Sequence, residues 1–208
     1  MAHWGAVGGH KSIEANALAG VSAALMMRAS LRSFNDGRGG DKMPIIRIGC
    51  GLNSGRVIAG QIGSDERLEF TVIGEAVSFA DRCETFNKPF GTEIMISEST
   101  WRLVGRFFIT EEMPSVKVKG KQVRMFAVVN VKDRRLCSKL LADLKKIPKT
   151  NPALSRKCVG PKGPKTLAEL RKLLGIPTPD LSKVNTDEEE KKYKVKKDQQ
   201  EETKVKSN

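Results

Sequence analysis

Short apolar segments separated by glycine-containing and polar turns dominate the first 130 residues, and they limit the chain to a fold that mixes strands and helices. Segments typical of strands occupy residues 1–4, 44–52, 56–62, 68–73, 92–96, 107–109, 115–118 and 123–129. The turn Asn53-Ser54-Gly55 between the second and third of these predicts a hairpin that joins them.

Two segments show the periodicity of amphipathic helices. Residues 11–34 place most of their apolar side chains on one face with Arg28 and Arg32 opposite, and Ser12 is suited to cap the N-terminus. Residues 74–87 predict a second helix, and Ser97 is expected to begin a short third one. Because strands and helices alternate without a strict βαβ repeat, we expect an α+β, ferredoxin-like sheet with helices on one face.

The composition changes after Asn130. Residues 1–130 hold 16 Lys and Arg against 13 Asp and Glu, whereas residues 131–208 hold 21 against 11, so most of the net charge of +13 falls in the second part. Apolar periodicity predicts short helices at residues 132–146 and 167–174, and the end of the chain, from Thr186, is predicted to be disordered. We therefore expect a folded domain, residues 1–130, followed by a basic, largely disordered tail, residues 131–208.

Several classes of protein are disfavoured. No apolar run approaches the roughly 18 residues that a membrane span needs, and the first residues do not show the pattern of a signal peptide. The four cysteines have no zinc-type spacing, which favours reduced thiols in a cytoplasmic protein. The glycines of residues 49–63 do not match a phosphate-binding loop, so we attribute them to tight turns and close packing.

A series of motifs links residues 46 to 121. Residues 46–64 read IRIGCGLNSGRVIAGQIGS and residues 69–82 read EFTVIGEAVSFADR. Residues 91–97 read GTEIMIS, and residues 116–121 read VKVKGK. In order and spacing this series resembles the second half of the catalytic domain of class III nucleotidyl cyclases, which make cyclic AMP or cyclic GMP. The resemblance covers about the first 130 residues.

The resemblance implies a chemistry. In this family the ribose 3′-hydroxyl attacks the α-phosphorus, and fixed cations stabilise the charge that builds on the phosphoryl oxygens. Arg82 matches the arginine that stabilises this transition state, and its forked donors suit a phosphoryl oxygen. Ser78 stands four residues earlier, where the family has an asparagine that orients the ribose. The alternative for Arg82 is a solvated helix arginine paired with Asp81 or Glu84.

Two further residues match substrate-binding positions. Thr71 matches a position that helps to select the base, and threonine there favours adenylate cyclase, because a hydroxyl can accept from the adenine amino group. The alternative is an ordinary β-branched strand residue. Lys119 matches the lysine of the V-K-G motif that contacts the triphosphate, and its alternative is a solvated loop lysine.

The metal ligands of the family have no match in this chain. The family holds two Mg²⁺ or Mn²⁺ ions with two aspartates, and both precede the strand that residues 1–5 resemble. Asp36 and Asp41 do not fit, because they lie after the first helix. The resemblance therefore predicts a cyclase domain without its first strands, without metal ligands and without the purine-reading lysine, which leaves the choice between ATP and GTP open.

Three functions are consistent with the sequence. The first is an adenylate cyclase that converts ATP to cyclic AMP and pyrophosphate, with this chain incomplete and inactive alone, because family active sites form between two subunits. It would act as a homodimer or with a complementary cyclase half, and any membrane attachment would come from upstream domains. The second, favoured by Ser78 and Glu75 in place of asparagine and aspartate, is a degenerate regulatory or dimerisation module. The third, binding of nucleic acid by the basic tail, is disfavoured because Tyr193 is its sole aromatic residue.

Overall fold

The computed structural model of the chain describes residues 1–6, 12–38, 43–64, 67–118, 121–148 and 150–184. Within these ranges a four-stranded sheet forms the centre, in the order β1 (Cys50–Leu52), β4 (Ile94–Ser97), β8 (Met125–Val131), β5 (Phe108–Glu112). β1 runs parallel to β4, and the other neighbours are antiparallel. Two hairpins are separate from this sheet: β2 (Ile58–Ser64) with β3 (Arg67–Ile73), and β6 (Val116–Val118) with β7 (Lys121–Val123).

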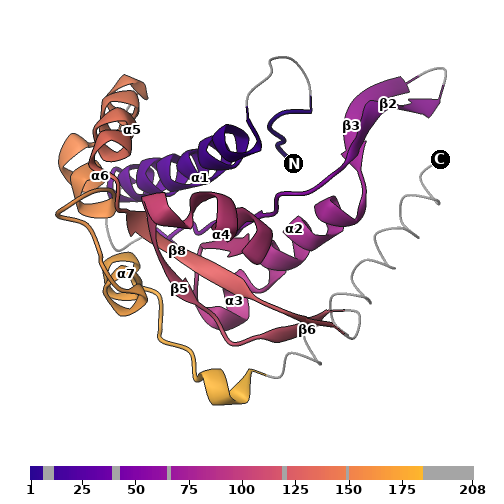
Figure 1. Cartoon of the computed structure of the whole chain (residues 1–208). Coiled ribbons are helices and arrows are strands. Elements are labelled where there is room, and N and C mark those ends of the chain that lie inside the picture. The colour runs from indigo at the N-terminus through magenta and orange to yellow at the C-terminus, as the bar shows by residue number, and fades with distance from the viewer. Residues whose placement is uncertain (7–11, 39–42, 65–66, 119–120, 149, 185–208) are drawn as a thin grey trace.

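Seven α-helices and two 3₁₀ helices occur in the described residues (Figure 1). The α-helices are α1 (Ile13–Asp36), α2 (Glu75–Thr85), α3 (Asn87–Phe90), α4 (Glu98–Val104), α5 (Arg134–Lys146), α6 (Pro152–Cys158) and α7 (Leu167–Leu174). The 3₁₀ helices are η2 (Gly105–Phe107) and η3 (Leu181–Lys183). None of these helices combines the length and hydrophobicity that are required to cross a bilayer.

Two helices begin where the sequence predicts a capping serine, at Ser12 and at Ser97. The Ser12 hydroxyl accepts a hydrogen bond from the backbone N–H of Ala15 at 3.1 Å, and the Ser97 hydroxyl accepts one from the N–H of Thr100 at 3.2 Å. Both predicted N-caps are therefore confirmed. Each hydroxyl satisfies one of the backbone donors that the first turn of a helix leaves without an intrahelical partner.

Strand pairing differs from the prediction. Residues 1–4 form no strand, and the predicted strand over residues 44–52 is reduced to β1. The predicted hairpin between β1 and β2 is wrong, because β1 pairs with β4 and β2 pairs with β3. The side chain of Asn35 explains part of the shortening: it donates to the Ile46 carbonyl at 2.8 Å and accepts from the Ile46 N–H at 3.1 Å. These backbone groups bond to a helix terminus instead of a neighbouring strand.

The prediction of helices on one face is also wrong. Every residue of β4 and β8 is buried, and alternate side chains enter two different clusters. Ile94 and Ile96 pack with α1, α4, α5 and α6, whereas Met95 packs with α2, α3 and α7. Strands that are covered on both faces lose the polar alternation of a half-exposed sheet and read as continuous apolar runs.

Arg28 lies inside the helix–sheet interface, not on the solvent face predicted for it. The side chain is 2% exposed, and its guanidinium donates to the carbonyl of Val128 at 2.9 Å and to that of Val129 at 2.5 Å. Burial lowers the pKa of Arg28, and the nearby carboxylate of Glu93 opposes that shift. Burial likewise raises the pKa of Glu93, against the effect of Arg28. The cation thus fastens α1 to the central strand β8.

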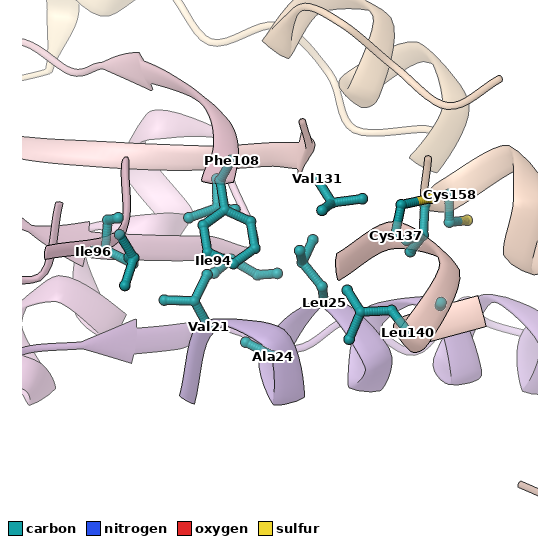
Figure 2. Packing of buried hydrophobic residues seen from close by; sticks show 14 of the residues in the cluster. Val21, Ala24, Leu25, Ile94, Ile96, Phe108, Val131, Cys137, Leu140 and Cys158 are labelled. Atoms are coloured by element: carbon teal, nitrogen blue, oxygen red, sulfur yellow. The ribbon is translucent and has the colours of Figure 1, made fainter. Parts of the chain in front are cut away.

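The expected largely disordered tail is wrong for residues 134–174. The predicted helices at 132–146 and 167–174 correspond to α5 and α7, but both pack on the sheet, and α6 lies between them. In α5, Leu140 and Leu144 are 3% and 1% exposed. Figure 2 shows Leu140 of α5 beside Leu25 of α1, in the cluster that also contains Ile94 and Phe108. Leucines at i, i+4 spacing give α5 an apolar stripe that is stable only when it is covered.

The positive charge belongs to this folded appendage. Residues 132–184 hold 14 Lys and Arg against 4 Asp and Glu, while residues 185–208 hold 7 of each. On α5 the exposed face carries Arg134, Arg135, Lys139, Lys145 and Lys146. The basic excess is therefore a property of folded helices rather than of a loose tail. The disorder that we predicted from Thr186 onward lies outside the described residues.

The buried thiol of Cys83 provides a test of this packing. Cys83 is 0% exposed, and burial raises its pKa to about 12, so less than about one in a thousand molecules carries the thiolate at pH 8. We expect iodoacetamide at pH 8 to label Cys83 only after denaturation, as measured by mass spectrometry of its peptide. The partly exposed Cys50 serves as the internal comparison and should label faster. Equal labelling of Cys83 in the native and denatured chain would contradict the packing described here.

Candidate functional site

Helix α2 carries two of the four predicted site residues. It begins at Glu75, directly after the N-cap residue Gly74, whose φ of 145° is a conformation that residues with a side chain rarely adopt. Helix α2 then lies against the backbone of β1. A side chain at Gly51 would place its first carbon 2.1 Å from the Ala80 carbonyl oxygen, so only glycine permits this approach. Gly51 therefore supports the attribution to close packing at this position, whereas a side-chain carbon at Gly60 would meet nothing within 4 Å.

Ser78 and Arg82 lie four residues apart and share one face of α2. The Arg82 side chain is 6% exposed and makes contacts within the chain, so it is not a solvated surface arginine. Ser78 is half-buried, and its backbone N–H donates to the Gly74 carbonyl at 3.4 Å. Glu75 is exposed in the first turn, where a carboxylate is favourable beside the positive end of the helix dipole.

The other two predicted residues come from the hairpins. Thr71 lies on β3 opposite Gly60 and is half-buried. Figure 1 shows the β2–β3 hairpin projecting from the body of the molecule at the end where α2 begins. Lys119 lies outside the described residues. Its flanking strands β6 and β7 form an antiparallel pair, with Val118 opposite Lys121.

A groove of about 470 Å³ separates the start of α2 from the β6–β7 hairpin. Its walls come from four segments, and its lining residues are Asn53, Ser54, Arg56, Glu75, Ala76, Phe79, Ser97, Glu98, Ser99, Gln122, Val123 and Arg124. The groove brings α2 and β7 to one surface. Thr71, Ser78 and Arg82 are not part of its lining.

The loop after β1 forms hydrogen bonds to two of the other segments that line the groove, α2 and α4. Asn53 donates to the Ala76 carbonyl at 2.9 Å and accepts from the Ser99 hydroxyl at 2.8 Å. Ser54 meets the Thr100 hydroxyl at 3.0 Å. Residues that we predicted to form a hairpin turn therefore connect β1 to the first turns of α2 and α4.

Arg124 is a groove residue that the sequence reasoning missed. Its guanidinium contacts both carboxylate oxygens of Glu112, at 2.6 and 2.8 Å, and one of Glu98 at 3.1 Å. The hydrogen bonds from Arg124 lower the pKa of Glu112, and those from Arg102 and then Arg124 lower the pKa of Glu98. No local pattern in the sequence marks Arg124, because its partners come from α4 and β5.

Across the ranges that the structure describes, no three His, Cys, Asp or Glu side chains converge on a point where they would hold a metal ion. Asp36 ends α1, and Asp41 lies outside the described residues.

Comparison with known proteins identifies the family. The family model of the adenylate and guanylate cyclase catalytic domain matches residues 2–130, and the chain belongs to this family. The resemblance that was inferred from the motifs is thereby confirmed.

Curated relatives include an adenylate cyclase of Anabaena cylindrica, which is 39% identical over 108 residues, 49% of this chain and 22% of the relative. The terminal-differentiation-specific adenylate cyclase of Dictyostelium discoideum is 30% identical over 126 residues, 58% of this chain and 6% of the relative. The chain thus spans less than a quarter of the length of these relatives.

Two solved structures show the same mixed α and β fold. The guanylyl cyclase Cya2 is 28% identical with a TM-score of 0.52, over 61% of this chain and 64% of that one. The adenylyl cyclase CyaB from P. aeruginosa is 27% identical with a TM-score of 0.52, over 60% and 63% of the two chains. One is named a guanylyl cyclase and the other an adenylyl cyclase, so the likeness alone does not select the base.

Proposed function

We propose that this chain supplies one side of the active site of a nucleotidyl cyclase, with ATP favoured over GTP and with cyclic AMP and pyrophosphate as products. The observation that carries the proposal is the shared face of Ser78 and Arg82 on α2, within a domain of the cyclase family. Thr71 supports ATP, because its hydroxyl can accept a hydrogen bond from the adenine amino group.

In this proposal each residue has a distinct task. Arg82 donates from its guanidinium to the α-phosphoryl oxygens as their negative charge grows, and Ser78 holds the ribose with its single hydroxyl. Lys119 pairs with the terminal phosphates. A hydroxyl has fewer donors and a shorter reach than the family's asparagine amide, so we expect looser ribose positioning than in relatives that keep the amide.

The second subunit completes the site. The two aspartates that hold Mg²⁺ or Mn²⁺ in this family have no match among these 208 residues, so they would come from a complementary cyclase half, or from another copy if the chain is part of a longer protein. A second candidate function is a non-catalytic module that pairs with a cyclase and regulates it. The serine at position 78 and the low exposure of Arg82 favour this alternative.

A mixed-subunit assay tests the proposal. The partner is an active adenylate cyclase domain whose own transition-state arginine and ribose asparagine have been replaced, so that it supplies only the aspartates and the purine lysine. With Mn²⁺ and ATP we expect no cyclic AMP from either protein alone and clear product from the mixture. GTP is expected to give at least about tenfold less product.

The outcomes separate the two functions. A mixture that forms a complex by analytical ultracentrifugation but gives no product would favour the regulatory module. Metal-dependent product from the chain alone would show that it carries its own metal ligands. That result would overturn the proposal that a second subunit supplies the aspartates. The unmodified partner domain, which is active by itself, is the positive control.

A further inference from the structure

Arg171 on α7 is buried against the segment that follows α2. The side chain is 7% exposed, and it donates from Nε to the Gly91 carbonyl at 3.0 Å and from Nη2 to the Phe90 carbonyl at 2.7 Å. Phe90 is the last residue of α3, and a single residue, Phe86, separates α3 from α2. One guanidinium therefore holds two successive carbonyls at the end of the helical segment that carries Arg82.

Apolar packing joins the same elements. Leu167, Leu170 and Leu174 of α7 are buried in one cluster with Cys83, Phe86 and Phe90. Cys83 is the neighbour of Arg82 in the sequence. Helix α7 thus shares one apolar cluster with the last turn of α2 and with α3, and it lies against the central strand β8.

Both ends of α7 are fixed to the cyclase domain. At its start, the backbone N–H of Leu167 donates to the carboxylate of Glu111 on β5. At its end, the Arg47 side chain donates to the carbonyl of Gly175 at 2.5 Å. Beyond it, Pro179 packs on Gly91, where a side-chain carbon would lie 2.8 Å from the proline ring. Helix α7 and the residues that follow it therefore contact the domain at separate points on β5, on the segment before β1 and on the loop after α3.

Asn87 transmits the position of α3 to α2 and β1. Its amide donates to the carbonyls of Cys50 and Glu84, both at 3.1 Å, and its side-chain oxygen accepts from the Thr92 hydroxyl at 2.8 Å. Asn87 at the start of α3 is therefore bonded both to the last turn of α2 and to β1.

Helix α2 needs such support. It has 11 residues and no side-chain cap at its N-terminus, and isolated helices of this length are marginal in water. An apolar residue in place of Arg171 could stabilise the fold equally well, since a buried apolar side chain often replaces a buried charge without loss of unfolding free energy. The planar guanidinium of Arg171, by bonding two successive carbonyls, also holds α7 and the end of α3 in one relative orientation, which a leucine side chain would not do.

We propose that α7 is a structural brace of the cyclase unit and that Arg171 is a positioning residue, which holds α2 so that Arg82 meets the nucleotide. The catalytic part of this inference rests on the proposed function of Arg82. Nothing in the family match extends to α7, because the match ends at residue 130.

Three variants of the full chain test the brace. Arg171→Met keeps most of the side-chain volume without donors, and Arg171→Lys keeps one donor group. Leu170→Ala removes neighbouring packing but leaves both hydrogen bonds of Arg171 in place. Hydrogen exchange followed by mass spectrometry reports on residues 77–91, and the mixed-subunit assay gives kcat and KM for ATP.

We expect Arg171→Met to speed exchange in residues 77–91 selectively and to lower kcat by about 10- to 100-fold, with KM changed by less than about threefold. Arg171→Lys should restore part of both properties. Leu170→Ala should lower the melting temperature but leave the kcat of the folded protein near that of the wild type.

Unchanged exchange in residues 77–91, or an equal increase throughout the chain, would overturn the brace. Faster exchange with an unaltered kcat would overturn the positioning role of Arg171. If the wild-type mixture gives no product while Arg171→Met still loosens residues 77–91, the brace stands and the proposed catalytic function fails. Should Arg171→Met not fold, the same comparisons apply to Arg171→Lys.

Discussion

Truncating the chain after Lys132 is expected to abolish cooperative folding of the remaining domain. The deletion removes α5, α6 and α7, which cover both faces of the central strands β4 and β8. It also removes five leucines that are at most 6% exposed: Leu140, Leu144, Leu167, Leu170 and Leu174. Truncating one such side chain to alanine costs about 2–5 kcal/mol, so losing all five costs about 10–25 kcal/mol, which is comparable to or larger than the roughly 5–15 kcal/mol that stabilises a typical domain.

The measurement is a thermal melt followed by circular dichroism. A chain that ends at Val184 keeps every contact described above and is the matched control, with an expected melt like that of the full chain. A cooperative melt of the shorter chain at the same temperature would show that the appendage contributes nothing to the fold, contrary to the packing in Figure 2.

Point variants on one helix sharpen this test. Leu144→Ala should cost about 2–5 kcal/mol of unfolding free energy, because Leu144 is 1% exposed and packs against the cluster around Leu25. Lys145→Ala on the exposed face of α5 should change it by less than about 0.5 kcal/mol. Equal effects would mean that α5 is not packed as described.

The parts of the fold that the sequence predicted are those that local chemistry decides. Ser12 and Ser97 satisfy donors only three residues away, so their pattern is visible in the chain itself. The leucine spacing of α5 predicted a helix correctly, but the surface that covers its apolar stripe comes from α1, about a hundred residues earlier. The basic composition after residue 130 favours disorder, but in the structure the lysine and arginine side chains of α5 lie on the solvent face of a packed helix.

Long-range contacts account for the parts that could not be predicted. The short extent of β1 depends on the bond between Asn35 and Ile46, which leaves no periodic signal. The burial of Arg28 depends on two carbonyls a hundred residues away. A basic residue on an amphipathic helix is normally assigned to the solvent face, and only the tertiary structure supplies the acceptors that reverse this assignment.

For the candidate site, motif spacing placed Ser78 and Arg82 on one helix face, which follows from helical geometry alone. The groove beside α2 was not foreseen, since Arg56, Ser99 and Arg124 come from three separate elements. Arg171 was missed for the same reason: its acceptors lie 80 and 81 residues earlier, so the predicted helix at 167–174 carries no local sign of the surface on which it packs.

Replacing Arg82 with methionine is expected to reduce kcat/KM in the mixed-subunit assay by about 100- to 1000-fold, the loss typical of removing one donor to a developing oxyanion. Arg82→Lys should recover little of this, because a single ammonium does not reproduce two parallel donors. Arg106→Met is the matched control, as Arg106 is an exposed arginine that pairs with Glu14 away from α2.

The low exposure of Arg82 makes a second measurement necessary, because an arginine that is 6% exposed also contributes to the fold. Replacing this side chain should cost about 0.5–3 kcal/mol of unfolding free energy, so rates must be expressed per folded molecule. An arginine that acts only in packing would lose stability and keep its rate per folded molecule. One that stabilises the transition state would lose that rate even where the folded fraction is complete, and this difference decides between a cyclase subunit and a regulatory module.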